Sequence, residues 1–128
     1  FVNWMIRVDK HELSNYQIDL ILLIGWMRIL SPVLVKSYKN KIINVHPSLL
    51  PKFAGGMDTN VHKEVLDAGE TETGCTIHYV DETVDGGEII LQKKCIIEPY
   101  DTPDTLKAKV QKLEGEAFVE VIASLSWA

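Results

Sequence analysis

The stretch LILLIG (residues 20–25) is a continuous apolar run that ends at a glycine. A short apolar run without polar alternation is typical of a β-strand buried on both faces of a sheet. The stretch KIINVHP (residues 41–47) has the same character. Its proline cannot donate a ladder hydrogen bond, so we expect that strand to end at His46. Between the two strands, Ser31 and Pro32 supply the cap and first turn of a short helix that runs to about Tyr38.

The remainder of the chain continues this alternation of strands and helices. We predict a helix over residues 59–68, with Gly69 as its C-cap, and then strands over 75–80 and 88–97. The short connection between these two strands favours an antiparallel pair. A final helix begins at 102–103 and carries one apolar stripe: Leu106, Val110, Leu113, Ala117 and Val121. The pattern predicts an α/β fold with helices against a mostly parallel sheet.

Composition and charge exclude several classes of protein. The 128 residues carry a formal charge of −5 and are 46% hydrophobic and 24% charged, which describes an ordinary globular domain. The acidic balance argues against nucleic-acid binding. No apolar run reaches the roughly 18 residues that a membrane span needs. The two cysteines, Cys75 and Cys95, fit no metal spacing or disulfide framework, which favours a reduced, intracellular chain.

Asn44 and His46 are the first candidates for chemistry. In such a sheet the ligand crevice is expected where strands end, after Ile24, Val45 and Tyr79. Asn44 and His46 are two residues apart at a strand end, so their side chains point to the same face. An amide can hold a developing oxyanion, and an imidazole can donate or accept a proton near neutral pH. The simpler alternative is a histidine satisfied by backbone groups, and spacing alone favours it.

The Asp-Gly-Gly sequence at residues 85–87 lies between the last two predicted strands. The Asp85 carboxylate beside a histidine would stabilise the imidazolium and raise its pKa, and the glycines would permit close approach of a ligand. Taken alone, Asp-Gly is a common tight turn, and the turn is the simpler interpretation. The nearby acids do not predict a metal site, because their spacing fits no calcium loop and no His or Cys completes a set: Asp81, Glu82, Asp85 and Glu88.

The remaining polar residues add no further catalytic pattern. His11, His62 and His78 have no partner at ligand spacing and are interpreted as surface or packing residues. The sequence contains no glycine-rich phosphate loop and no serine or cysteine nucleophile with an evident base. The residues by themselves therefore predict an α/β domain with an Asn/His/Asp candidate site.

Three longer strings, in this order, resemble the folate-dependent formyltransferase family. Residues 24–32 (IGWMRILSP) resemble its folate-cleft segment, and residues 43–51 (INVHPSLLP) resemble its signature. Residues 74–80 (GCTIHYV), followed by the Asp-Gly-Gly of 85–87, are similar to its strand and catalytic loop. The resemblance covers residues 18–124. It implies a Rossmann-like three-layer fold with one antiparallel strand in a mostly parallel sheet.

The resemblance also implies a reaction, in which the amine of glycinamide ribonucleotide attacks the formyl group of 10-formyltetrahydrofolate during purine synthesis. Asn44 would hold the formyl oxygen as it becomes an oxyanion, and His46 would be the general acid. Asp85 would pair with His46, raise its pKa and help to move the proton to the folate nitrogen. A cytoplasmic enzyme, monomeric or homodimeric, is implied, with these two small molecules as partners and without metal, nucleic acid or membrane.

Binding residues follow from the same resemblance. One segment would bind folate chiefly through its backbone groups: Met27, Arg28, Ile29 and Leu30. The 81–85 segment would close the opposite side, through Asp81, Glu82 and Asp85, and Asn44 would lie at the formyl end. Four further residues match family positions near the nucleotide substrate: Pro47, Gly55, Gln111 and Glu114. The simpler alternative for Gln111 and Glu114, which lie three apart on one helix face, is a solvated surface.

Two features depart from the family pattern. Residues 55–63 are longer than in some members, and the family's first strand and glycine-rich phosphate turn are absent. We therefore expect residues 1–128 to be the C-terminal two thirds of a catalytic domain in a longer protein. Other folate-dependent formyltransferases, formyltetrahydrofolate hydrolase and a non-catalytic folate-binding domain stay open as alternatives. Residues 47–51, with Gln111 and Glu114, favour the purine enzyme.

Overall fold

The computed structural model describes residues 18–23, 31–55, 59–82 and 86–125. The predicted alternation of strands and helices is confirmed over these residues. In chain order the elements are β1 (Ile21–Leu23), α3 (Pro32–Ser37), β2 (Ile42–His46), α4 (Thr59–Asp67), β3 (Glu72–Tyr79), β4 (Ile89–Ile96) and α5 (Pro103–Ser124).

The four strands form one sheet in the order β1-β2-β3-β4. β1 is parallel to β2, and β3 is antiparallel to both β2 and β4. Three strands therefore run in one direction and β3 runs against them, which confirms the expectation of one antiparallel strand. Because β3 lies between β2 and β4, the pair β1–β2 is the single parallel pair among the described strands.

The direction of β3 overturns one prediction about where the strand ends meet. His46 is paired with Thr76, in the middle of β3, whereas Tyr79 is paired with Ile43 near the start of β2. The N–H of Val80 donates to the Ile42 carbonyl at 2.9 Å. In an antiparallel pair, the carboxyl ends of the two strands lie at opposite ends of the sheet. The residues that follow β3 therefore begin at the opposite end of the strands from His46.

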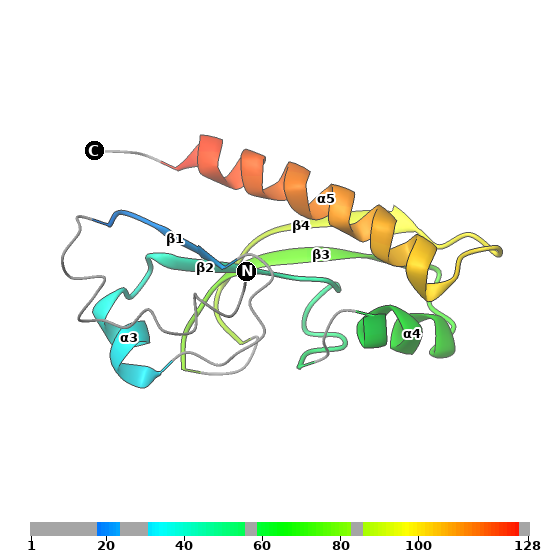
Figure 1. The fold of residues 1–128 in the computed structure, drawn as a ribbon, viewed down its shortest axis with the longest axis horizontal. Helices are drawn as coiled ribbons and strands as arrows, with labels where there is room; N and C mark the ends of the chain where they lie inside the picture. The colour runs from blue at the N-terminus through cyan, green and yellow to red at the C-terminus, as the bar shows by residue number, and fades with distance from the viewer. Residues whose placement is uncertain (1–17, 24–30, 56–58, 83–85, 126–128) are drawn as a thin grey trace.

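Helices cover both faces of the sheet, as the three-layer expectation requires. Figure 1 shows α5 along one side, with α3 and α4 on the other side. The predicted stripe of α5 is confirmed, since Leu113 is half-buried and packs against the core and the other four residues are buried: Leu106, Val110, Ala117 and Val121. Phe118 is buried with them, and the main core lies between this helix and residues of β2 and β3: Ile43, Cys75 and Ile77.

Local caps explain where the helices begin. The Ser31 side chain accepts a hydrogen bond from the Leu34 N–H at the start of α3. Thr102 and Thr105 form a reciprocal capping box at the start of α5. Each cap satisfies backbone N–H groups that have no partner within the helix. At the C-terminal end of α4, Gly69 adopts a φ of +72°, the left-handed conformation expected of a glycine C-cap.

A second core cluster joins α4 to the first turns of α5. Val61, Val65 and Leu106 are fully buried in it. Phe53, from the loop that follows β2, packs against the same cluster. This packing ties the loop after His46 to two helices.

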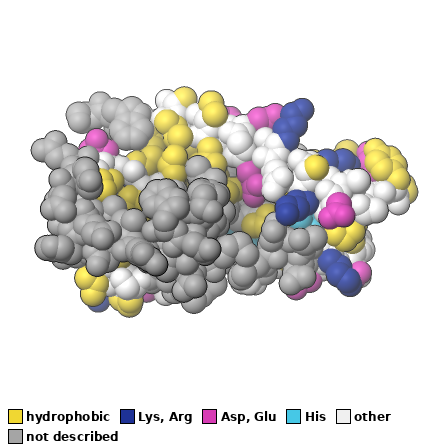
Figure 2. Space-filling model, in the orientation of Figure 1, with side chains coloured by type: hydrophobic (Ala, Val, Ile, Leu, Met, Phe, Trp, Pro, Cys, Tyr) yellow, Lys and Arg dark blue, Asp and Glu magenta, His cyan; other side chains and the backbone are white. Residues whose placement is uncertain are grey.

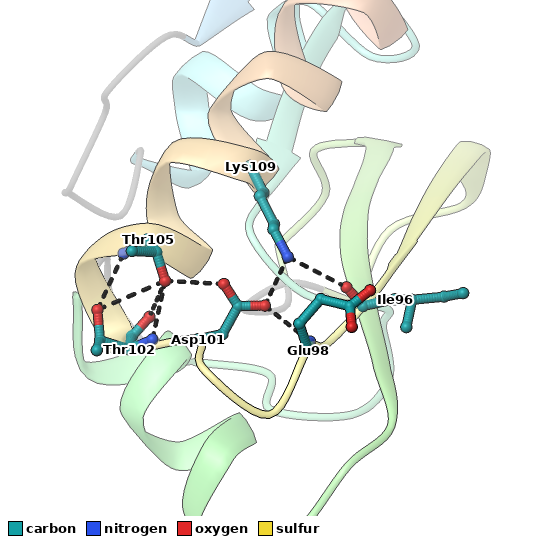
Figure 3. A network of polar contacts seen from close by, with 6 residues as sticks. All are labelled: Ile96, Glu98, Asp101, Thr102, Thr105 and Lys109. Carbon is teal, nitrogen blue, oxygen red and sulfur yellow. Dashed lines mark hydrogen bonds and ion pairs between the residues drawn. The ribbon is translucent and has the colours of Figure 1, made fainter.

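The Asp101 carboxylate organises the start of α5 (Figure 3). It accepts hydrogen bonds from the Glu98 N–H at 2.8 Å, from the Thr105 hydroxyl at 2.8 Å and from Lys109 Nζ at 2.6 Å. Its side chain is fully buried, and Lys109 also lies 5.6 Å from the centre of the Tyr100 ring. Burial alone would raise the pKa of Asp101, but these hydrogen bonds outweigh it and lower the pKa below its ordinary value.

Replacing Asp101 by asparagine is expected to lower the free energy of unfolding by about 2 kcal/mol at neutral pH, because charge-assisted hydrogen bonds are lost. A folded-state pKa below the unfolded value gives a contribution that is complete above the unfolded value and lost as pH falls through the folded one. The difference between parent and Asp101→Asn should therefore be constant above about pH 5 and shrink below about pH 4, as measured by urea unfolding across pH.

The matched control for this prediction is Asp67→Asn, which removes an exposed ion pair with Lys63 on α4. Exposed pairs contribute little, so this substitution should change the urea midpoint only slightly at any pH. A difference between the parent and Asp101→Asn that stays the same at acid pH would contradict the prediction.

Candidate active site

Asn44 and His46 lie on the face of the sheet that points away from α5. Their neighbours Ile43 and Val45 pack into the core beneath α5. Because side chains alternate along a strand, Asn44 and His46 share the opposite face, and that they share one face confirms the prediction. Asn44 is half-buried and His46 is buried.

Two residues of β3 complete this polar group, and the sequence analysis did not assign them to the site. His78 is paired with Asn44, and Thr76 is paired with His46. Residues directly opposite in an antiparallel pair share a face, so all four polar side chains lie together. His78 and Thr76 are both buried. The interpretation of His78 as a packing residue is compatible with its burial, but its place beside Asn44 depends on the β2–β3 register.

The His46 ring is held by the loop that follows it. Its Nε2 lies 3.0 Å from the Phe53 carbonyl oxygen, which can only accept a hydrogen bond, so Nε2 donates. A backbone partner is what the simpler interpretation of His46 expected, and it occupies one of the two ring nitrogens. Phe53 itself adopts a φ of +58° and packs into the cluster between α4 and α5.

The site loop, residues 47–53, is fixed by polar contacts to β3 and β4. The Ser48 hydroxyl donates to the Lys52 carbonyl at 2.7 Å, across the loop. Thr76 and Gln92 bind its backbone from the sheet: Thr76 Oγ1 donates to the Ser48 carbonyl at 2.8 Å, and Gln92 Nε2 donates to the Leu50 carbonyl at 2.9 Å. Ser48 is fully buried. The loop is thus an ordered part of the site.

Asp81 and Glu82 follow β3 and are exposed. Glu82 lies 3.6 Å from Lys36 of α3, so this segment is next to that helix. The hairpin closes through Gly87, where an added Cβ would lie 1.7 Å from the Tyr79 carbonyl oxygen. Gly87 thus lies against the backbone of β3, and the close approach of a ligand stays a prediction. Five predicted site residues lie outside the described residues: Asp85, Met27, Arg28, Ile29 and Leu30.

The four predicted substrate-binding residues separate into two places. Pro47 directly follows His46 and is half-buried, and Gly55 lies two residues beyond Phe53 with a φ of +79°. Both therefore belong to the chain around the site loop. Gln111 and Glu114 lie on α5, where Gln111 is exposed and Glu114 is half-buried.

Cys75 shows which face of the sheet Glu114 approaches. Burial, and then the Glu114 carboxylate, raise the pKa of the Cys75 thiol to about 11. Cys75 belongs to the core beneath α5, on the opposite face from Asn44 and His46. The described residues thus do not bring Glu114 into contact with Asn44 or His46, and its role in substrate binding stays a prediction. The raised pKa keeps the Cys75 thiol protonated, which agrees with the lack of a predicted cysteine nucleophile.

A cavity of about 230 Å³ borders the site loop and the sheet, and Glu70, Glu72 and Lys94 are among its lining residues, whereas Asn44 and His46 are not. Basic and acidic side chains are interspersed on the face shown in Figure 2.

Within the described ranges, no three His, Cys, Asp or Glu side chains gather as a metal ion would require. None of the described helices has the length and apolar character of a membrane span.

The sequence of this chain matches a known protein family. Residues 8–122 match the model of the formyl transferase family. The chain belongs to that family.

Curated relatives of this formyl transferase chain are much longer proteins. It is 45% identical over 121 residues to the trifunctional purine biosynthetic protein adenosine-3 of Drosophila pseudoobscura pseudoobscura, which covers 94% of the chain and 9% of that protein. It is 44% identical over 115 residues to the Bos taurus protein of the same name, with 88% and 11% covered. The chain thus spans about a tenth of the length of these relatives.

Solved structures agree with the fold. The phosphoribosylglycinamide formyltransferase of Coxiella burnetii is 44% identical with a TM-score of 0.80, over 88% of this formyl transferase chain and 51% of that one. The Streptococcus pneumoniae enzyme of the same name is 32% identical with a TM-score of 0.84, over 96% and 66%. A formyltetrahydrofolate deformylase from Pseudomonas syringae is 30% identical with a TM-score of 0.75, over 81% and 34%.

Proposed function

We propose that this protein transfers the formyl group of 10-formyltetrahydrofolate to the amine of glycinamide ribonucleotide, a step of purine synthesis. The observation that carries the proposal is the placement of Asn44 and His46 on one face at the end of β2, in a chain 44% identical to a phosphoribosylglycinamide formyltransferase. Relatives named for purine biosynthesis support the same substrate. A cytoplasmic location and a monomeric or homodimeric state are part of the proposal.

Each proposed catalytic residue acts on the charge that develops during transfer. As the amine forms its bond to the formyl carbon, the Asn44 amide donates to the oxygen that becomes negative. His46, as the imidazolium, supplies a proton, and Asp85 stabilises that cation. The amine loses one proton and the folate nitrogen gains one when its bond to the formyl carbon breaks. No net proton is consumed in the transfer.

Binding is proposed around this centre. The Met27–Arg28–Ile29–Leu30 segment would bind the folate ring through its backbone, and Asp81, Glu82 and Asp85 would close the opposite side. Pro47 and Gly55 lie on the chain that carries the site loop, which supports a role beside the reacting amine. Gln111 and Glu114 are proposed to contact the ribonucleotide.

A formyl-folate hydrolase is the second candidate, because the chain is also similar to a formyltetrahydrofolate deformylase. The two functions differ in the acceptor, an amine or water. The natural full-length protein should therefore be given 10-formyltetrahydrofolate with and without glycinamide ribonucleotide, and the formylated ribonucleotide identified by mass spectrometry. We expect folate turnover to depend on the ribonucleotide. Equal turnover without it would establish the hydrolase, and folate binding without turnover would establish a non-catalytic domain.

A further inference from the structure

We propose that Gln92 is a positioning residue for His46. It holds the site loop so that the Phe53 carbonyl occupies Nε2, and Nδ1 is the ring atom that delivers the proton. That His46 delivers a proton rests on the proposed function. The positioning of the ring by Gln92 rests on the described contacts alone. It assigns a role to a residue of β4, a strand that does not pair with β2.

The Thr76 hydroxyl is the first link, because all of its hydrogen-bonding capacity is used. It donates its one hydrogen to the Ser48 carbonyl at 2.8 Å. It accepts from the Leu50 N–H at 3.0 Å and from Gln92 Nε2 at 3.0 Å. A hydroxyl has one donor and two lone pairs, so Thr76 is saturated only when Gln92 is present. A fully buried, fully satisfied group of this kind has one stable orientation.

Gln92 is the second link, because its amide reaches both the loop and Thr76. Its Nε2 donates to the Leu50 carbonyl at 2.9 Å, across 42 positions of sequence, and to Thr76 Oγ1. Leu50 is therefore held at its N–H by Thr76 and at its carbonyl by Gln92. Removing the amide would leave the Leu50 carbonyl and one Thr76 lone pair without these bonds.

The far end of the site loop carries the contact to His46. The Lys52 N–H donates to the Leu49 carbonyl at 3.1 Å, and the Ser48 hydroxyl holds the Lys52 carbonyl. The residue that follows, Phe53, presents its carbonyl to His46 Nε2 at 3.0 Å. The position of that carbonyl thus depends on a chain of hydrogen bonds that begins at Gln92.

The contact has a chemical consequence for His46. The Phe53 carbonyl can only accept a hydrogen bond, so the contact requires a hydrogen on Nε2 in both the neutral ring and the imidazolium. The proton that the ring gains and loses is then the one on Nδ1, and we expect the reactant to meet the ring from that side. Loss of the Phe53 contact would allow the other neutral tautomer, which presents the wrong atom.

The first test needs no substitution. Long-range ¹H–¹⁵N correlation spectra of the His46 ring in the natural full-length protein, followed to alkaline pH, identify which nitrogen keeps its hydrogen. We expect the neutral ring to be the Nε2–H tautomer. A neutral ring with its hydrogen on Nδ1 would overturn the proposal, whatever the protein's activity.

The second test compares Gln92→Met with Lys94→Met in the same protein. Both side chains come from β4 and face the same way, but Lys94 is exposed and pairs with Glu72 at 3.5 Å. Gln92→Met should give a mixture of His46 tautomers and lower kcat about 10-fold, with KM for both substrates changed less than about twofold, because a slight misplacement costs rate rather than binding. Lys94→Met should leave the tautomer and kcat unchanged.

These readouts separate failure of the inference from failure of the proposed function. If Gln92→Met keeps both the parental tautomer and the parental kcat, Gln92 does not position His46, although formyl transfer stands. If the parent transfers no formyl group, the tautomer spectra of the parent and the two variants still decide whether Gln92 orients the ring. If Gln92→Met does not fold, the parental spectrum remains decisive for the Nε2 assignment.

Discussion

Replacement of His46 by alanine is expected to lower kcat for formyl transfer roughly 10²- to 10⁴-fold, the usual contribution of a general acid. Asn44→Ala should cost roughly 10²- to 10³-fold, the effect of removing one oxyanion donor. Both losses should appear in kcat and kcat/KM together, because the proposed interactions strengthen only in the transition state. Steady-state formyl transfer to glycinamide ribonucleotide measures both.

The double variant sharpens this prediction. Asn44 and His46 act on the same developing charge, so their combined loss should be smaller than the product of the two single losses. Folate binding should persist in each variant and should be measured separately by calorimetry. Turnover within about threefold of the parent in either single variant would show that the assigned role is wrong. The smallest loss of kcat expected for either residue is about 10²-fold.

The largest expected effect on stability is that of Leu106→Ala, which should lower the free energy of unfolding by about 2–5 kcal/mol. Leu106 is fully buried where α5 meets Val61 and Val65 of α4. Removing its side chain loses buried apolar surface and leaves a cavity that two packed helices cannot close. Because Phe53 packs against the same cluster, kcat should also fall. Urea unfolding and steady-state kinetics measure the two effects.

Val119→Ala is the matched control for this prediction, since Val119 lies on the same helix and is 69% exposed. Exposed substitutions of this kind change stability by less than about 0.5 kcal/mol. A similar loss of stability in both variants would show that burial at the α4–α5 contact does not determine the effect, since alanine is the better helix former at both positions. An unchanged Leu106→Ala protein would contradict the packing itself.

The boundaries of the helices and the end of β2 were predictable because local physics sets them. Ser31 and Thr102 cap their helices, Pro47 ends β2, and Gly69 ends α4. β3 is longer than predicted, beginning at Glu72 instead of Cys75. The additional residues look polar in sequence, and they become strand because β4 pairs with them. A strand boundary depends on its partner in a way that a helix cap does not.

The candidate site was predictable in part. The two-residue spacing of Asn44 and His46 places them on one face, and the structure has them there. Thr76 and His78 carry the same spacing on β3, so alternation on the neighbouring strand was the signal that could have found them. Gln92 gave no such signal, because its partners lie 42 and 16 positions away.

The amino-acid sequence by itself determined the order of strands and helices, the apolar stripe of α5 and the face shared by Asn44 and His46. Each of these depends on residues within a few positions of one another. The tertiary structure decided that β3 also pairs with β2, that Tyr79 therefore lies at the opposite end of the sheet from His46, and that the Phe53 carbonyl occupies His46 Nε2. These depend on register and on hydrogen bonds between distant segments, whose geometry exists only after the sheet has formed.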